Sequence, residues 1–267
     1  MTGPAPAKIN LALVVGPRRP DGKHEVATIY QRVDLCDRVR VEPAATTTVE
    51  GFAGDTIVRG ALAELGAPHG WRVRLDKKIP VAAGLGGGST DAATALRLAN
   101  AQLEQPLAPE RLHALAAEIG ADVPFFLHDG PQLGTGDGTE LARLELPQDF
   151  AVLLFLPHGE VKRSTAQVYA DFDARRGEDG WEQRLGELRA SLAVLRRPRD
   201  LATLPPNDLA SSPWSGELLE RGAFRADVSG AGPTVYGLFN HRADARRAGR
   251  DLKRAGRVWA TVPAWYG

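Results

Sequence analysis

Hydrophobic and polar positions along the chain follow two periods, and the period changes several times between its ends. Alternating or unbroken apolar positions predict strands over residues 8–15, 29–35, 38–42, 71–75, 151–156, 235–239 and 257–262. Apolar positions at helical spacing predict helices over residues 56–65, 92–103, 109–119, 181–195 and 243–255. Both halves therefore mix strands with helices. The polar stretch before the buried strand at 151–156 predicts a domain boundary near Gln148, which divides the chain into residues 1–148 and 149–267.

Composition and charge narrow the classes of partner. The chain has 267 residues with 33 basic and 33 acidic side chains, so its formal net charge is zero. A neutral chain lacks the positive field that attracts nucleic acid or an anionic membrane, and we expect neither partner. Cys36 is the single cysteine, which leaves no internal disulfide and fits a reducing compartment. The apolar run at 11–15 is too short to span a bilayer. We therefore expect a soluble, cytoplasmic protein that is small enough to carry one active site.

The most informative stretch is glycine-rich and precedes a predicted helix. Residues 80–93 read PVAAGLGGGSTDAA, with four glycines in the five positions 84–88. A glycine loop that leads into a helix presents free backbone N–H groups and the positive end of the helix dipole, and both favour phosphate. Ser89 stands where a Walker A loop needs lysine and where a dinucleotide fingerprint needs glycine. A plain flexible turn is the alternative, but the helix that follows directly favours a phosphate site.

Several segments of the chain resemble the motifs of one family, the GHMP kinases, which includes homoserine, galactose and mevalonate kinases. They are residues 80–93, residues 6–11 (PAKINL) and residues 228–237 (VSGAGPTVYG). Other segments resemble the members of this family that phosphorylate a cytidine diphosphate-linked methylerythritol. These are residues 5–11, 19–25 (RPDGKHE), 120–126 (GADVPFF), 164–166 with Tyr169, and 206–209. The matches run from residue 5 to about 239 in the expected order.

The resemblance implies both a fold and an activity. The fold would be an α+β, two-domain GHMP kinase fold. Its N-terminal half would be similar to domain 2 of ribosomal protein S5, its C-terminal half would be ferredoxin-like, and the active site would lie between them. The activity would be ATP-dependent phosphorylation of the methylerythritol 2-hydroxyl in non-mevalonate isoprenoid precursor biosynthesis. Mg²⁺ is expected with the ATP, and the protein is expected to be a monomer or a homodimer.

The candidate catalytic groups are a lysine and an aspartate. Lys8 and Asn10 share one face of the first predicted strand, and Asp122 follows a predicted helix end within an apolar segment. A solvated lysine on an edge strand and a helix-capping aspartate are the structural alternatives. The resemblance implies a catalytic pair at Lys8 and Asp122, with Asn10 at the methylerythritol part. Phosphoryl transfer mainly requires positioning and charge stabilisation, which a carboxylate and a cation supply.

The ATP-binding positions that the resemblance implies surround the glycine loop. They are Lys77, Pro80, Val81, Ala82, Ala83, Gly84, Leu85, Gly86, Gly87, Gly88, Ser89 and Thr90. Ser89 and Thr90 would contact the phosphates or magnesium, whereas Lys77 could equally be a solvated loop charge. Gly230 and Gly232 would form the turn of the third motif near the phosphates, although a plain turn between strands would also explain them. The sequence has no dedicated cluster of metal ligands.

The substrate-binding positions that the resemblance implies are His24, Thr165 and Tyr169. His24 would read the cytosine edge, and Tyr169 would stack on one side of the base. Lys23 departs from the family, which usually has an aromatic residue there, so the other side of the base lacks its stacking partner. Ala210 is a second departure, because the family more often has an acidic residue at this position. We expect both departures to affect cytidine affinity and not the chemistry.

Three other functions compete with this interpretation. The chain could be another small-molecule kinase of the family, of the homoserine or mevalonate type. It could also be a non-catalytic nucleotide-binding protein on the same fold, although Lys8, Asp122 and the glycine loop are all intact. An RNA-binding protein is disfavoured, because the net charge is zero and no interleaved aromatic and basic residues occur.

Overall fold

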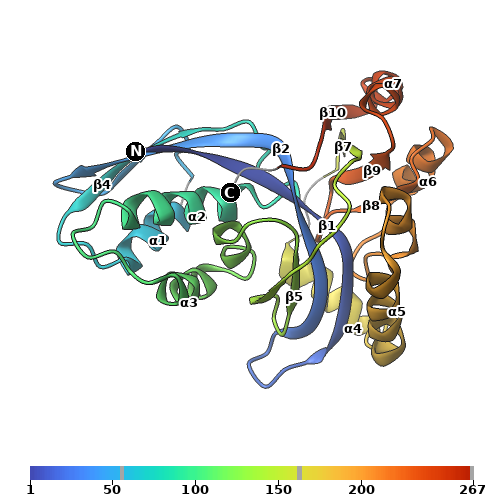
Figure 1. Cartoon of the computed structure of the whole chain (residues 1–267), viewed down its shortest axis with the longest axis horizontal. Coiled ribbons are helices and arrows are strands. Elements are labelled where there is room, and N and C mark those ends of the chain that lie inside the picture. Colours follow the sequence, from blue (N-terminus) through green and yellow to red (C-terminus); the bar gives the residue numbers. More distant parts are fainter. Residues whose placement is uncertain (55–56, 161–163, 265–267) are drawn as a thin grey trace.

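The molecule is organised around one long antiparallel hairpin (Figure 1). The computed structural model describes residues 1–54, 57–160 and 164–264. The hairpin consists of β1 (Thr2–Arg18) and β2 (His24–Ala44). Residues 5–16 of β1 are all buried, so this strand is covered on both faces. The predicted strands at 29–35 and 38–42 are one continuous strand, because the pairing of β2 with β1 runs through the residues between them.

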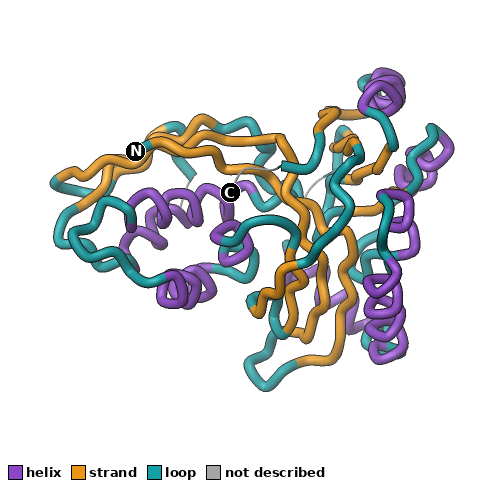
Figure 2. The backbone as a smooth tube through the Cα atoms, viewed as in Figure 1, coloured by secondary structure: helices purple, strands orange, loops and turns teal. Residues whose placement is uncertain are grey.

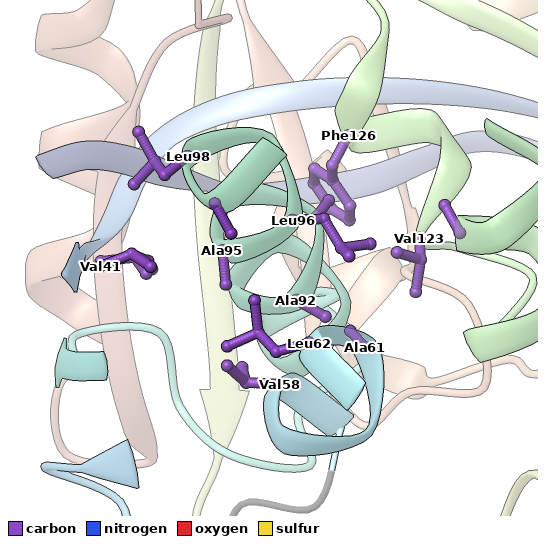
Figure 3. Close-up of a cluster of buried hydrophobic side chains, with 14 of the residues drawn as sticks. Val41, Val58, Ala61, Leu62, Ala92, Ala95, Leu96, Leu98, Val123 and Phe126 are labelled. Carbon is purple, nitrogen blue, oxygen red and sulfur yellow. The ribbon is translucent and has the colours of Figure 1, made fainter. Parts of the chain in front are cut away.

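The first sheet has six strands and carries the helices of the N-terminal half. Its order is β3-β4-β2-β5-β6, and β1 pairs with β2. The further strands are β3 (Thr48–Glu50), β4 (Gly70–Asp76), β5 (Gln132–Thr135) and β6 (Glu140–Arg143). The helices are α1 (Ile57–Glu64), α2 (Gly87–Asn100), α3 (Pro109–Ile119) and the 3₁₀ helix η1 (Pro124–Leu127). Leu62 of α1, Leu96 of α2 and Phe126 of η1 belong to one buried cluster around α2 (Figure 3).

The second sheet has four antiparallel strands in the order β10-β7-β9-β8. They are β7 (Ala151–Pro157), β8 (Arg225–Val228), β9 (Val235–Phe239) and β10 (Gly256–Thr261). The helices are α4 (Thr165–Ala174), α5 (Trp181–Val194), η2 (Pro198–Thr203), α6 (Pro213–Glu220) and α7 (Arg242–Leu252). Helical segments follow β7 and β9, so the order of elements along the chain is the ferredoxin-like β-α-β-β-α-β. The predicted α+β fold in two halves is confirmed, and the boundary near Gln148 stays a prediction.

The two sheets pack together at the hairpin (Figure 2). A single buried cluster contains Ile9 and Leu11 of β1, Leu154 of β7 and Tyr236 of β9. Leu85 of the glycine loop belongs to the same cluster, so the loop is anchored where the sheets meet. None of the helices in the described ranges is long and apolar enough to cross a membrane.

Candidate active site

The glycine loop connects β4 to α2, and its backbone geometry requires glycine. Gly84 and Gly86 have φ angles of +79° and +70°, in the left-handed region that favours glycine. Gly86 is also the N-cap of α2 and makes no side-chain capping hydrogen bond. The first N–H groups of α2 are therefore open to an anion, which agrees with the predicted phosphate site.

The third motif packs directly against this loop. Ser229 Oγ donates a hydrogen bond to the Gly84 carbonyl oxygen at 3.0 Å, and the Thr234 N–H donates to the Ala83 carbonyl oxygen at 3.2 Å. A Cβ atom on Gly230 would lie 3.4 Å from Lys8 Nζ. The second half of the chain therefore holds the glycine loop and approaches Lys8, although these residues are far apart in sequence.

A cavity of about 810 Å³ lies between these elements and collects nearly all the predicted site residues. Those that line it are Lys8, Asn10, His24, Lys77, Pro80, Val81, Ala82, Ala83, Gly84, Leu85, Gly86, Gly87, Gly88, Ser89, Asp122, Thr165, Tyr169 and Gly230. Thr90 and Gly232 do not line it. Thr90 is fully buried, and its contact with phosphate or magnesium stays a prediction. Gly232 instead packs behind the loop, where its carbonyl oxygen faces Gly84.

Lys8 and Asp122 meet on one wall of the cavity. Lys8 Nζ lies 3.3 Å from Asp122 Oδ2 and donates a hydrogen bond to Asn10 Oδ1 at 2.7 Å. Asn10 Nδ2 donates in turn to Thr28 Oγ1 at 2.8 Å. The Lys8 side chain is 4% exposed and that of Asp122 is 34% exposed. The ammonium is therefore held in place by fixed partners, and the carboxylate remains accessible to a ligand in the cavity.

Tyr30 belongs to this site and was not identified from the sequence. It pairs with Asn10 in the register of β1 and β2, and its ring stacks on Phe125 with centroids 4.9 Å apart. Lys8 Nζ lies 5.8 Å from the Tyr30 ring centroid. Burial, together with the Asp122 carboxylate, raises the pKa of Tyr30 well above its ordinary value. The phenol therefore stays protonated beside the Lys8–Asp122 pair.

The tip of the hairpin is joined to α4 through Asp173, another residue that the sequence analysis missed. Asp173 Oδ1 lies 2.7 Å from His24 Nε2, and Asp173 Oδ2 accepts a hydrogen bond from Arg18 Nη2 at 2.7 Å. His24 stacks on Tyr169 with ring centroids 4.9 Å apart. One face of Tyr169 is therefore already covered, and no hydrogen bond to His24 Nδ1 occurs within the described ranges.

Lys23, which replaces the usual aromatic residue, is paired at the rim of the cavity. Its Nζ lies 2.5 Å from Asp137 Oδ2. The Lys23 side chain is 55% exposed and that of Asp137 is 14% exposed. This position therefore carries an ion pair in place of a stacking face.

Lys77 lies beside the loop between two carboxylates that the sequence analysis also missed. Lys77 Nζ donates to Asp37 Oδ2 and to Asp91 Oδ2. Burial raises the pKa of Asp91 to about 7. Asp91 Oδ1 is buried and has no hydrogen-bond partner among the described residues. No group of three or more histidine, cysteine, aspartate or glutamate side chains that could hold a metal ion occurs among the residues described.

The raised pKa of Asp91 predicts a pH-dependent stability. The folded chain keeps this proton at pH values where the unfolded chain has lost it, so this contribution to stability is lost as pH rises through about 7. From about pH 5 to about pH 7, the free energy of unfolding of the wild type should fall by about 1–2 kcal/mol relative to that of Asp91→Asn. Urea denaturation of both proteins at the two pH values measures this difference. Equal changes in both proteins would contradict it.

Comparisons with known proteins agree with this geometry. The family models named GHMP kinases N terminal domain and GHMP kinases C terminal match residues 55–130 and 210–258. The chain is 40% identical to a 4-diphosphocytidyl-2-C-methyl-D-erythritol kinase of Mycolicibacterium gilvum, over 94% of this chain and 85% of that protein. It is 36% identical to the enzyme of the same name from Geotalea daltonii, over 94% of this chain and 93% of that protein.

Solved structures show the same relationship. A crystal structure of 4-(cytidine 5'-diphospho)-2C-methyl-D-erythritol kinase superposes with a TM-score of 0.78 and 32% identity, covering 99% of this chain and 100% of that one. Homoserine kinase from Cytophaga hutchinsonii superposes with a TM-score of 0.73 at 19% identity, over 100% and 96% of the two chains, and shows the common fold alone. On these sequence and structural matches, the chain belongs to the 4-diphosphocytidyl-2-C-methyl-D-erythritol kinases of the GHMP kinase family.

Proposed function

We propose that this kinase uses Lys8 and Asp122 to transfer the γ-phosphoryl group of ATP to the 2-hydroxyl of 4-diphosphocytidyl-2-C-methyl-D-erythritol. The observation that carries the proposal is the 3.3 Å contact of Lys8 Nζ with Asp122 Oδ2 in a cavity shared with the open N-terminus of α2. A cavity of about 810 Å³ is at the large end of small-molecule sites. It therefore suits a reaction that brings two extended ligands together.

The proposed transfer uses groups whose positions are already fixed. The substrate 2-hydroxyl oxygen attacks the γ-phosphorus, the bond from that phosphorus to the ADP oxygen breaks, and the hydroxyl proton passes to Asp122. The Lys8 ammonium, held by Asn10, stabilises negative charge that develops on the transferred group. The N–H groups at the start of α2 hold the phosphates of ATP in place.

Mg²⁺ is proposed to accompany the ATP, where it would neutralise phosphate charge. It commonly binds through one or two carboxylates together with substrate phosphates, and keeps several waters. The unpartnered Oδ1 of Asp91 and the Ser89 side chain, both on residues that line the cavity, fit this mode of binding. The cation therefore needs no cluster of three protein ligands in this site.

The cytidine part is proposed to lie at the other end of the cavity, near His24, Tyr169 and Thr165. His24 Nδ1 would contact the base, since Nε2 is the nitrogen that contacts Asp173. Lys23 and Asp137 form the rim there. The proposed cytoplasmic location, the monomer or homodimer, and the absence of a nucleic-acid partner remain predictions from the sequence.

A comparison of acceptor alcohols tests the proposal. ADP release with ATP and Mg²⁺ is measured in parallel with 4-diphosphocytidyl-2-C-methyl-D-erythritol, unconjugated methylerythritol, homoserine and mevalonate. We expect turnover with the cytidyl substrate alone, because the other three lack the base that His24 and Tyr169 would contact. Turnover of homoserine or mevalonate at a comparable kcat/KM would overturn the substrate assignment. Binding of ATP without turnover of any acceptor would instead support a non-catalytic protein.

A further inference from the structure

Three charged side chains from distant parts of the chain meet beside the glycine loop, and we call them the lysine brace: Asp37, Lys77 and Asp91. Asp37 is on β2, Lys77 follows β4, and Asp91 is on α2 (Figure 1). Lys77 Nζ contacts both carboxylates, and lies 2.5 Å from Asp91 Oδ2. The side chains of Asp37 and Asp91 are 0% and 3% exposed, and that of Lys77 is 15% exposed. The brace is therefore an almost buried ion cluster.

Asp37 also fixes the backbone in front of the loop. Its Oδ1 accepts hydrogen bonds from the N–H groups of Lys78 and Ile79, the latter at 2.8 Å. Both oxygens of Asp37 thus bind donors from the segment that leads into the loop, and Lys77 connects this segment to Asp91. Because α2 begins at Gly87, the brace joins the two ends of the loop at residues 80–86. The loop can therefore change its shape little while the contacts of the brace are intact.

The charges of the brace decide whether Lys77 binds the phosphates directly or positions the glycine loop. A lysine that binds phosphate acts as a point charge, so it needs positive charge that other groups have not neutralised. Two carboxylates already contact the Lys77 ammonium. The brace therefore supplies no excess positive charge to the phosphates, which instead face the open N–H groups of α2.

We propose that Lys77 is a positioning residue, which together with Asp37 and Asp91 holds the glycine loop in its phosphate-binding shape before ATP arrives. A loop that is ordered in advance loses less conformational entropy on binding, so more of the interaction energy appears as affinity. This inference rests on the proposed function only in taking ATP as the ligand of the loop.

The test compares variants of the brace with a neighbouring lysine. Lys77→Met and Asp37→Asn should each raise the Kd for a non-hydrolysable ATP analogue with Mg²⁺ by roughly tenfold or more. Isothermal titration calorimetry measures this Kd. KM for ATP should rise more than kcat falls, and Lys77→Arg should recover part of the affinity. Lys78→Met is the matched control, because Lys78 is exposed and outside the brace, and it should bind like the wild type.

Asp37→Asn separates the two roles by the direction of its effect. If Lys77 bound the phosphates directly, removing one carboxylate would free its charge, and the analogue would bind equally well or more tightly. That result, or unchanged affinity in both Lys77→Met and Asp37→Asn, would overturn the proposal. Hydrogen exchange at residues 80–88 should accelerate in both variants and stay unchanged in Lys78→Met.

Two controls exclude misfolded variants and an error in the proposed acceptor as causes of the result. Thermal denaturation establishes that each variant folds. If Asp37→Asn does not fold, hydrogen exchange at residues 80–88 of ligand-free Lys77→Met decides, because a lysine that only bound the phosphates would leave this exchange unchanged. The titration needs no acceptor alcohol, so an error in the acceptor would leave it intact. A wild-type chain that binds no ATP analogue would contradict the proposed function, whereas equal binding by the wild type and the brace variants would contradict the brace alone.

Discussion

Replacing Asp122 by asparagine should lower kcat by roughly 10²–10⁴-fold, the range that a positioned acid–base group contributes. Asparagine keeps the size of the side chain but cannot take the hydroxyl proton, and it removes the negative partner of Lys8. The Lys8 ammonium would keep its hydrogen bond to Asn10 Oδ1, so the cavity should keep its shape. Because the buried Lys8 ammonium loses its carboxylate partner, some stability should also be lost, and thermal denaturation establishes that the variant is folded. Steady-state kinetics of ADP release, with ATP and the cytidyl substrate varied in turn, measure the effect.

Asp129→Asn provides the matched control for this change. Asp129 lies in the same segment of the chain, its side chain is 74% exposed, and it does not line the cavity. We expect it to keep the wild-type kcat. The affinity of Asp122→Asn for the ATP analogue should also be unchanged, because the loop and the brace are intact. A loss of kcat below about threefold would show that Asp122 neither accepts nor orients the proton.

The fold and most of the cavity could be predicted because the relevant residues lie in contiguous segments. The glycine loop, the first strand and the third motif each form one stretch of sequence, and the structure brings them to the same cavity. Thr90 shows the limit of this reasoning. A motif identifies the residues at the start of a helix, but the direction of each side chain depends on how the helix packs, and Thr90 is fully buried.

Most of the missed residues meet the predicted site residues only through tertiary pairing. Tyr30 lies near Lys8 because the register of the hairpin places it opposite Asn10. Asp37 and Asp91 are separated by much of the N-terminal half and meet only at the Lys77 ammonium. A single sequence carries no signal for such meetings. For Asp173 the sequence does carry a signal, because the helix that contains it has a recognisable start. Ser164 is the N-cap of α4 and accepts a hydrogen bond from the Gln167 N–H.

The short strands were missed for a similar reason. β3 and β8 have three and four residues, and each is defined by its pairing with a neighbour more than by its own pattern. The longer strand β9 and the helix α3 have clear periodic patterns, and their predicted bounds match those observed. Periodic pattern thus predicts these two elements, whereas pairing with a neighbour defines the short strands.

Gly84→Ala should destabilise the protein by about 3 kcal/mol and raise KM for ATP at least about tenfold, because it disrupts the contact between the loop and the third motif. A Cβ atom at this position would lie 2.4 Å from the Ser229 carbonyl oxygen and 2.8 Å from the Gly232 carbonyl oxygen. Both obstacles are backbone atoms, so the loop or the third motif has to move. The φ angle of +79° adds strain for any residue with a Cβ.

Gly66→Ala is the control that separates the two effects of Gly84→Ala, which are the steric clash of the new Cβ atom and the strain of a positive φ angle. Gly66 follows α1 with a φ angle of +68°, and a Cβ there would meet nothing within 4 Å. It should cost only the left-handed strain, about 1 kcal/mol, and leave KM for ATP unchanged. Urea denaturation gives the two stability differences, and ATP-dependent kinetics give KM. Equal stability losses in the two variants, with normal ATP affinity in Gly84→Ala, would show that the third motif does not hold the loop in its binding shape.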